Sequence, residues 1–130
     1  MNFRLKTSSS TGEKILALQT NTGLTWNILA RIAIALSLKD PSLPENVTNR
    51  SGLEIHRNAL TGEMDFVYKT IIKQHSQRNV PEDEYFPDLF NAHLERGMTI
   101  LDNEYKYAGN FEKLLLSLLE MGGQQDGVSG

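Results

Sequence analysis

Basic residues alternate with apolar ones at the start of the chain, in residues 2–7. This alternation predicts a short strand, because successive side chains of a strand point to opposite faces. Arg4 and Lys6 would lie on one face, and Phe3 and Leu5 on the other. A two-stranded ribbon fits the DNA major groove, where Arg and Lys side chains reach base edges or phosphates. The pattern therefore indicates a strand that contacts DNA.

Four more residues in the first third of the chain are candidates for the same role. Thr25 is placed to begin a helix, and the free N–H groups and the hydroxyl at such a position can hold a phosphate. Asn27 and Arg31 are four residues apart on the polar strip of that helix, and Lys14 adds a charge to the preceding helix. The alternative is a solvated basic edge, in which Arg31 pairs with an acidic residue of the second half. The hypothetical DNA-binding set is Arg4, Lys6, Lys14, Thr25, Asn27 and Arg31.

Charge is distributed unevenly along the chain. Residues 1–39 contain five basic residues and one acidic residue, which gives a net charge of +4. Residues 40–130 contain eight basic and fifteen acidic residues, which gives −7, so the whole chain carries −3. Such asymmetry predicts one surface for a polyanion and a second surface for a different partner.

Catalytic and metal-binding patterns are missing from the sequence. There is no cysteine, which excludes thiolate metal sites and a cysteine nucleophile. No glycine-rich phosphate-binding motif occurs, and His56, His75 and His93 do not match a metal-binding spacing. Asp83 and Glu84 are adjacent, and Glu63 and Asp65 are two residues apart, so neither pair of carboxylates shares a helix face. We therefore expect a protein that is not an enzyme and that needs no metal or cofactor.

A strand and two helices must position the candidate DNA-binding residues. The sequence Ser10-Thr11-Gly12-Glu13 matches a capping box and predicts a helix start near Ser10, and Gly23 predicts the end of that helix. The second helix is predicted over residues 26–38, with Thr25 as its N-cap. This helix is apolar nearly all round, so it should be buried on most sides. In a chain of this size, such burial favours contact with another subunit.

The rest of the chain predicts a helical body. Residues 40–60 form a turn-rich connection that should contain a short strand or turn. Further helices are expected over residues 61–77, from Pro81 onward, and over residues 110–121, with Gly122-Gly123 ending the last one before a flexible tail of residues 122–130. The fold class is mainly α, with a short N-terminal strand plus about five helices in one domain of residues 1–121. Its basic part spans residues 1–39, and its acidic helical part spans residues 61–121. We see no signal peptide or membrane-spanning segment and expect a cytoplasmic protein.

Two resemblances connect these elements with known proteins. Residues 1–39 resemble a ribbon-helix-helix unit, in which strands from two copies pair to form a DNA-reading ribbon. A more specific resemblance is to the DndE family of DNA sulfur modification proteins. Three segments resemble motifs of that family and occur in its order: residues 22–33 (TGLTWNILARIA), residues 60–63 (LTGE) and residues 90–97 (FNAHLERG).

The DndE resemblance implies a small, mainly α, non-catalytic protein that acts with other Dnd proteins when sulfur replaces a non-bridging phosphate oxygen of DNA. It also implies a homotetramer that binds DNA, with a preference for nicked duplex, through basic surface residues. A cysteine desulfurase, an ATP-pyrophosphatase-like protein and an ATPase would supply the chemistry. Two alternatives stay open: a ribbon-helix-helix transcriptional regulator, and an assembly adaptor that docks partner enzymes without any DNA contact of its own.

Overall fold

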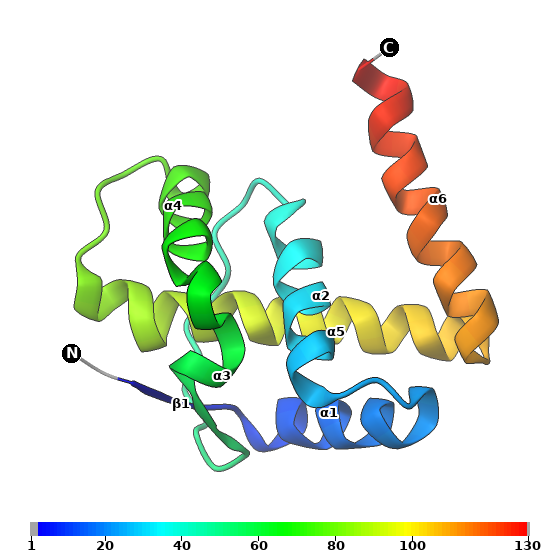
Figure 1. Ribbon diagram of the computed structural model, residues 1–130, viewed down its shortest axis with the longest axis horizontal. Coiled ribbons are helices and arrows are strands. Elements are labelled where there is room, and N and C mark those ends of the chain that lie inside the picture. Colours follow the sequence, from blue (N-terminus) through cyan, green and yellow to red (C-terminus); the bar gives the residue numbers. More distant parts are fainter. Residues whose placement is uncertain (1–2, 130) are drawn as a thin grey trace.

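A long helix, α5 (Phe90–Ala108), runs through the middle of the fold, and several other helices pack against it (Figure 1). The computed structural model describes residues 3–129, with side chains for residues 3–121. In chain order the other elements are β1 (Arg4–Lys6), α1 (Ser9–Thr22), α2 (Trp26–Leu38), β2 (Glu54–His56), α3 (Arg57–Thr61), the 3-10 turn η1 (Gly62–Met64), α4 (Asp65–Ser76), the π-helical segment η2 (Glu84–Leu89) and α6 (Phe111–Ser129). The fold is mainly α with one two-stranded antiparallel sheet, which confirms the predicted class. Within the described residues, no helix combines the length and apolarity needed to cross a membrane.

Helices α2 and α5 cross at very short range. A Cβ atom placed on Gly97 of α5 would lie only 1.8 Å from the carbonyl oxygen of Ala33 in α2. The crossing buries Leu29, Ala33 and Ile34, so the chain itself covers most of this apolar helix. Contacts within the chain therefore account for the apolar residues on one face of α2, and contact with a second subunit stays a prediction. Ile28, which is 41% exposed, lies outside this buried face.

The N-terminal strand pairs with a strand of the same chain. β1 and β2 are antiparallel, with Arg4 opposite His56, Leu5 opposite Ile55 and Lys6 opposite Glu54. Leu5 and Ile55 point into the core, and the other four side chains are exposed. The short strand expected in the 40–60 connection is thus β2, and it takes the place that a second copy holds in a ribbon-helix-helix dimer.

The ends of the N-terminal elements differ from the prediction at two points. Phe3 lies before the start of β1 and is 61% exposed, so it does not share the buried face of Leu5. Helix α1 begins at Ser9, and its N-cap is Ser8 rather than Ser10, since the Ser8 hydroxyl accepts a hydrogen bond from the Thr11 N–H at 3.0 Å. Ser8 is selected because its hydroxyl also donates to the Glu95 carboxylate of α5.

Other helix boundaries follow the local signals. Gly23 has the left-handed φ of 78° expected of a helix stop. Helix α2 has the predicted bounds with Thr25 at its N-cap position. Gly62, with φ 52°, ends α3 and begins η1, so η1 and α4 take the place of the helix predicted over residues 61–77, whereas α3 lies at the end of the segment predicted as a connection.

Two more boundaries differ from the prediction: the start of α5 and the end of α6. Phe86 has extended φ and ψ values of −135° and 125°, because the residue before a proline is disfavoured in the α conformation. Helical structure thus begins at Glu82, next to the predicted Pro81, but it is interrupted at Phe86, and the regular helix α5 begins at Phe90. Helix α6 continues through Gly122-Gly123 to Ser129, where the sequence predicted an end at residue 121 and a flexible tail. A glycine inside a helix costs only about 1 kcal/mol, which other helical residues can offset.

Candidate nucleic-acid interface

Arg4 and Lys6 lie on the outer face of the two-stranded ribbon, as the alternation predicted. Both side chains are exposed, while Leu5 between them is buried. Arg4 forms an ion pair with Glu54 of β2, with 3.6 Å between Nη1 and Oε1. The two side chains are 62% and 45% exposed. An exposed pair of this kind is weak, about 0–1 kcal/mol, so a phosphate can compete with Glu54 for Arg4.

Arg31 of α2 contacts α3, the helix that directly follows β2. Its Nε donates a hydrogen bond of 2.9 Å to the backbone carbonyl of Leu60. This contact uses one of the five N–H donors of the guanidinium group, and the residue is exposed. Among residues 3–121, the other guanidinium donors of Arg31 have no partner, and its Nε contacts a carbonyl where the alternative interpretation required an acidic residue.

The first turn of α2 is less available than its sequence suggested. Thr25 is exposed, but its hydroxyl donates to the side-chain carbonyl of Asn27 and makes no capping bond. The N–H of Trp26 already donates to the side chain of Gln19 at 2.9 Å. Trp26 is half-buried and packs against the core. Thr25 and Asn27 must exchange their mutual hydrogen bond before they can hold a phosphate.

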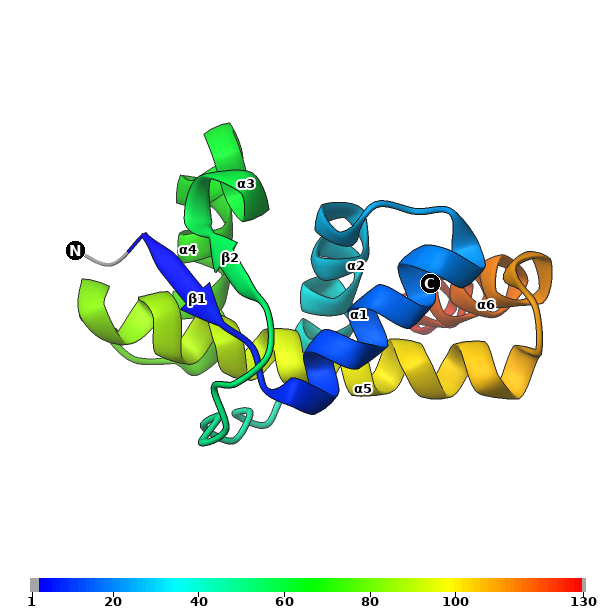
Figure 2. The same cartoon turned by 90° about the horizontal axis from the view of Figure 1, so that it is seen from below.

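Lys14 is directed toward α5. Its Nζ donates to the hydroxyl of Thr99 at 3.4 Å, and the residue is half-buried. The ribbon and α1 nevertheless lie on the same side of α5, as Figure 2 shows from below. The structure thus places the six predicted residues on β1, on α1, and on α2 with its N-cap, with Lys14 directed toward α5 and Arg31 toward α3.

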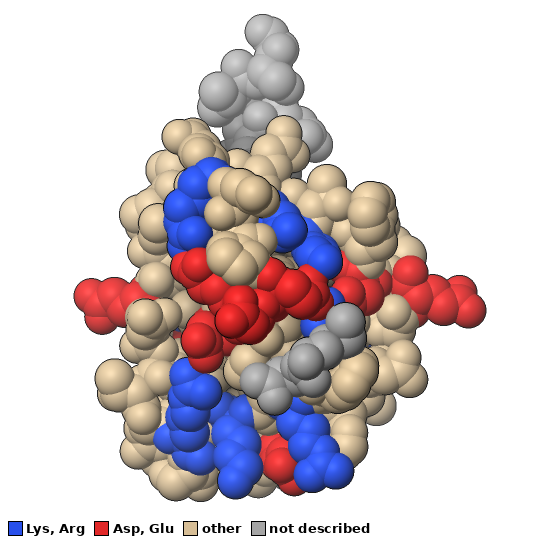
Figure 3. Space-filling model, turned by 90° about the vertical axis from the view of Figure 1, so that its left-hand side faces the viewer, with Lys and Arg blue, Asp and Glu red and all other residues tan. Residues whose placement is uncertain are grey.

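The two parts of the chain differ in how their cations are compensated. In residues 40–121 most basic side chains have acidic partners: Arg50–Asp88, Arg57–Asp65, Arg57–Glu82, Lys69–Glu82, Arg78–Glu84, Arg96–Asp40 and Lys106–Asp102. Among residues 3–121, no carboxylate lies within 4.0 Å of the charged atoms of Lys6, Lys14 or Arg31. Figure 3 shows a band of Asp and Glu between groups of Lys and Arg on one face. Uncompensated positive charge is therefore available in the N-terminal unit.

The ribbon adds two residues that the sequence reasoning missed. Glu54 and His56 of β2 are exposed on the same face as Arg4 and Lys6, because they are their direct partners in the register. The alternation Leu53-Glu54-Ile55-His56 was a local signal for this strand. Its register with β1 could not be derived from that signal alone.

One buried serine and histidine pair resembles catalytic chemistry. The Oγ atom of Ser37 lies 2.8 Å from Nδ1 of His93, and Nε of Arg96 donates to the same Oγ at 2.8 Å. Ser37 and His93 are both 0% exposed, so a substrate cannot reach them. Burial, assisted by the positive charges of His75 and Arg96, lowers the pKa of His93 to about 3. The pair therefore joins α2 to α5 as a neutral structural contact.

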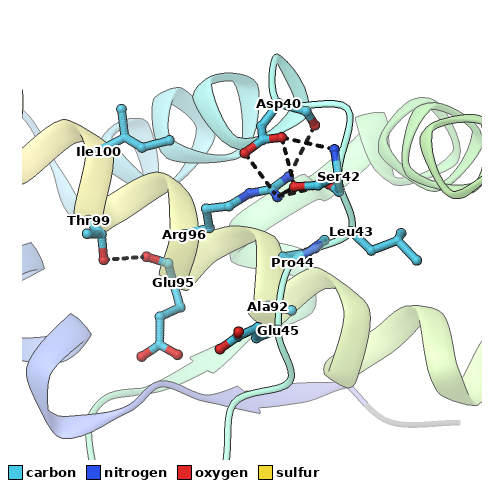
Figure 4. A pocket seen from close by; sticks show the side chains of 10 residues that line it. All are labelled: Asp40, Ser42, Leu43, Pro44, Glu45, Ala92, Glu95, Arg96, Thr99 and Ile100. Carbon is cyan, nitrogen blue, oxygen red and sulfur yellow. Dashed lines mark hydrogen bonds and ion pairs between the residues drawn. The ribbon is translucent and has the colours of Figure 1, made fainter.

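The hollow beside Arg96 does not provide a free cation. This hollow of about 430 Å³ lies between α5 and the segment after α2, and Arg96 points toward Asp40 and Ser42 (Figure 4). The guanidinium donates to the carbonyls of Ser37 and Ser42 at 2.7 and 2.9 Å and to the Ser42 hydroxyl at 3.0 Å. The described residues also contain no cluster of three or more His, Asp or Glu that could hold a metal ion.

Comparisons with known proteins connect this geometry with a family. The model of the DNA sulphur modification protein DndE matches residues 4–109, so α6 lies outside the match. The crystal structure of DndE from Escherichia coli B7A, involved in DNA phosphorothioation modification, is 22% identical, with a TM-score of 0.63 over 75% of this chain and 96% of that chain. A mutant DndE involved in DNA phosphorothioation is 21% identical, with a TM-score of 0.61 over 79% of this chain and 99% of that chain. The comparison with curated proteins found no match. The family match covers most of the chain, the two solved structures share its fold, and the chain belongs to the DndE family of DNA sulphur modification proteins.

Proposed function

We propose that this protein is a non-catalytic DNA-binding subunit of the phosphorothioation system. It binds the phosphate backbone of duplex DNA through Arg4, Lys6, Lys14, Thr25, Asn27 and Arg31. The observation that carries the proposal is that, within the described residues, Lys6, Lys14 and Arg31 form no ion pair with a carboxylate within 4.0 Å, while most cations of the second half are paired. Unpaired cations on one unit are the electrostatic basis for binding a polyanion.

Phosphate contact is better supported than base reading. β1 has three residues, and only Arg4 and Lys6 project outward from it. Two flexible cations beside an acidic residue, Glu54, supply charge without the fixed arrangement of donors and acceptors that base recognition requires. A nick lets a duplex bend at low cost, so nicked DNA can follow the protein surface more closely than intact DNA. We therefore expect nicked duplex to be preferred.

The protein also acts with other Dnd proteins in this proposal, and its expected assembly is a homotetramer. Exposed apolar side chains favour a second role as an assembly adaptor: Phe66 of α4 is 77% exposed, and Leu119 of α6 is 71% exposed. Large exposed apolar side chains are typical of protein contact surfaces. Light scattering coupled to size-exclusion chromatography measures the oligomer directly, and a monomeric mass at micromolar concentration would refute the tetramer.

Salt titration of DNA binding tests the phosphate contacts. Binding of nicked and intact duplexes is measured by fluorescence anisotropy from low to high salt, for the unaltered protein and for Arg4→Ala/Lys6→Ala. Each phosphate contact contributes about 0.9 to the slope of log affinity against log salt, so the double variant should lower the slope by roughly 2. The control Lys73→Ala/Lys113→Ala removes two positive charges from α4 and α6 and should change the slope much less.

Two results would contradict the proposal. A slope near zero for the unaltered protein would exclude phosphate contacts. Equal losses in the ribbon variant and in the control variant would show that net charge, rather than the N-terminal unit, determines binding. Circular dichroism of all variants checks that each protein is folded, since exposed substitutions of this kind usually change stability by less than about 0.5 kcal/mol.

A further inference from the structure

The outer face of the ribbon contains a histidine directly opposite Arg4. In the antiparallel register, Arg4 faces His56 and Lys6 faces Glu54, and all four side chains are exposed. Directly opposed residues of two strands have Cβ atoms about 4.5–5.5 Å apart and point to the same side. A phosphate held by Arg4 is therefore within reach of the His56 ring.

His56 differs from the other two histidines in its contacts. Nε2 of His75 lies 2.6 Å from the carbonyl oxygen of Asp40, and Nδ1 of His93 lies 2.8 Å from the Ser37 hydroxyl. No hydrogen bond to the ring of His56 is formed by residues 3–121. Its two ring nitrogens are free to donate to an external acceptor, and a protonated imidazole has two donors and no acceptor.

Both basic and acidic side chains surround His56. Arg4 lies opposite His56 in the register, and Glu54, two residues before His56 on the same strand, pairs with Arg4. Lys6 lies diagonally across the ribbon, and Arg57, the next residue, turns its guanidinium toward Asp65 and Glu82. On α2, Arg31 contacts α3 through the Leu60 carbonyl. A phosphate at Arg4 adds negative charge to this group and favours the protonated ring.

We propose that His56 is a third phosphate-contacting residue of the ribbon and that it makes DNA affinity increase as the pH falls. The inference rests on the proposed function, because it names a further residue of the same surface. Histidine changes its charge between about pH 5 and pH 8, so this contact is added or removed within the physiological range. Because phosphate binds the protonated ring more tightly, binding and proton uptake favour each other.

The test measures affinity for one nicked duplex at pH 6.0 and pH 8.0, at constant ionic strength. The unaltered protein should bind about threefold to tenfold more tightly at pH 6.0, since one linked proton changes affinity by at most tenfold per pH unit. His56→Gln keeps a hydrogen-bonding side chain without a titrating charge and should show no such increase. His56→Lys keeps a permanent charge and should bind tightly at both pH values.

The outcomes separate this inference from the proposed function. If His56→Gln retains the pH dependence of the unaltered protein, or if the unaltered protein shows none, His56 is not the linked contact, and DNA binding itself is untouched. If the unaltered protein does not bind DNA at either pH, the proposed function fails and this inference fails with it. Circular dichroism at both pH values confirms that the variants compared are folded.

Discussion

Replacing Gly97 by alanine should destabilise the protein strongly, although alanine is the better helix former. The new Cβ atom would lie 1.8 Å from the oxygen, 2.3 Å from the carbonyl carbon and 2.8 Å from the Cα atom of Ala33. Ordinary contact begins at 3.4 Å, so α2 and α5 must separate by about 1.6 Å at their crossing. Overpacking a core costs about 1–3 kcal/mol or more, and the gain in helix propensity is only about 1 kcal/mol. We expect a net loss of roughly 2 kcal/mol or more.

The measurement is urea unfolding together with thermal unfolding. A loss of 2 kcal/mol corresponds to a decrease in Tm of roughly 6–12 °C for a domain of this size. Asn103→Ala, at an exposed position of the same helix, is the control for helix propensity and should be neutral or slightly stabilising. Adding Ala33→Gly to Gly97→Ala should not restore stability, because the clash involves backbone atoms. A Gly97→Ala variant as stable as the unaltered protein would refute the close crossing.

Three further predictions concern buried polar groups, and urea unfolding measures each of them. The pKa of His93 in the folded protein, about 3, lies below its value in the unfolded chain. The contribution of His93 to the free energy of unfolding should therefore be complete above about pH 6.5 and fall by about 1.4 kcal/mol per pH unit below it. A His93→Gln variant with the same acid dependence would contradict this. Arg57→Ala breaks a buried pair and should cost about 3 kcal/mol, whereas Arg78→Ala breaks an exposed pair and should cost less than about 1 kcal/mol, and equal costs would refute the distinction. Ser37→Ala leaves the Arg96 Nε–H without its partner and should cost about 1–3 kcal/mol, and an unchanged midpoint would show that water replaces the hydroxyl.

Local signals predicted several elements correctly because the residues that decide them are neighbours in the sequence. The alternation around Leu5 correctly separated a buried side chain from the exposed Arg4 and Lys6. Gly23 directly follows the last residue of α1, and Thr25 directly precedes the first residue of α2, as their sequence signals predicted. The N-cap of α1 was wrong because the local capping box of Ser10 and Glu13 favours Ser10, and no local signal favours Ser8. Contacts with Glu95, more than 80 residues away, single out Ser8.

The sequence indicated which charged residues could form the candidate interface, but not how they are arranged relative to other elements. Net charge predicted a polyanion-binding surface in the N-terminal unit, which stays a prediction, and the structure shows that Arg4, Lys6 and Arg31 are exposed. The sequence could not show that the Leu60 carbonyl would contact Arg31, or that His56 would lie opposite Arg4. It also gave no sign that α1 directs Lys14 toward Thr99. These relations depend on how separate elements pack.

The sequence by itself determined the mainly α class, the alternating basic strand, the bounds of α2 and the family resemblance. Each follows from side-chain periodicity, helix-ending residues or short motifs, which act within one or two turns of chain. Only the tertiary structure decided that α5 covers α2, that β2 pairs with β1 and which cations have acidic partners. These outcomes depend on contacts between residues far apart in the chain, such as Gly97 with Ala33 and Arg4 with Glu54, and local sequence does not encode their register.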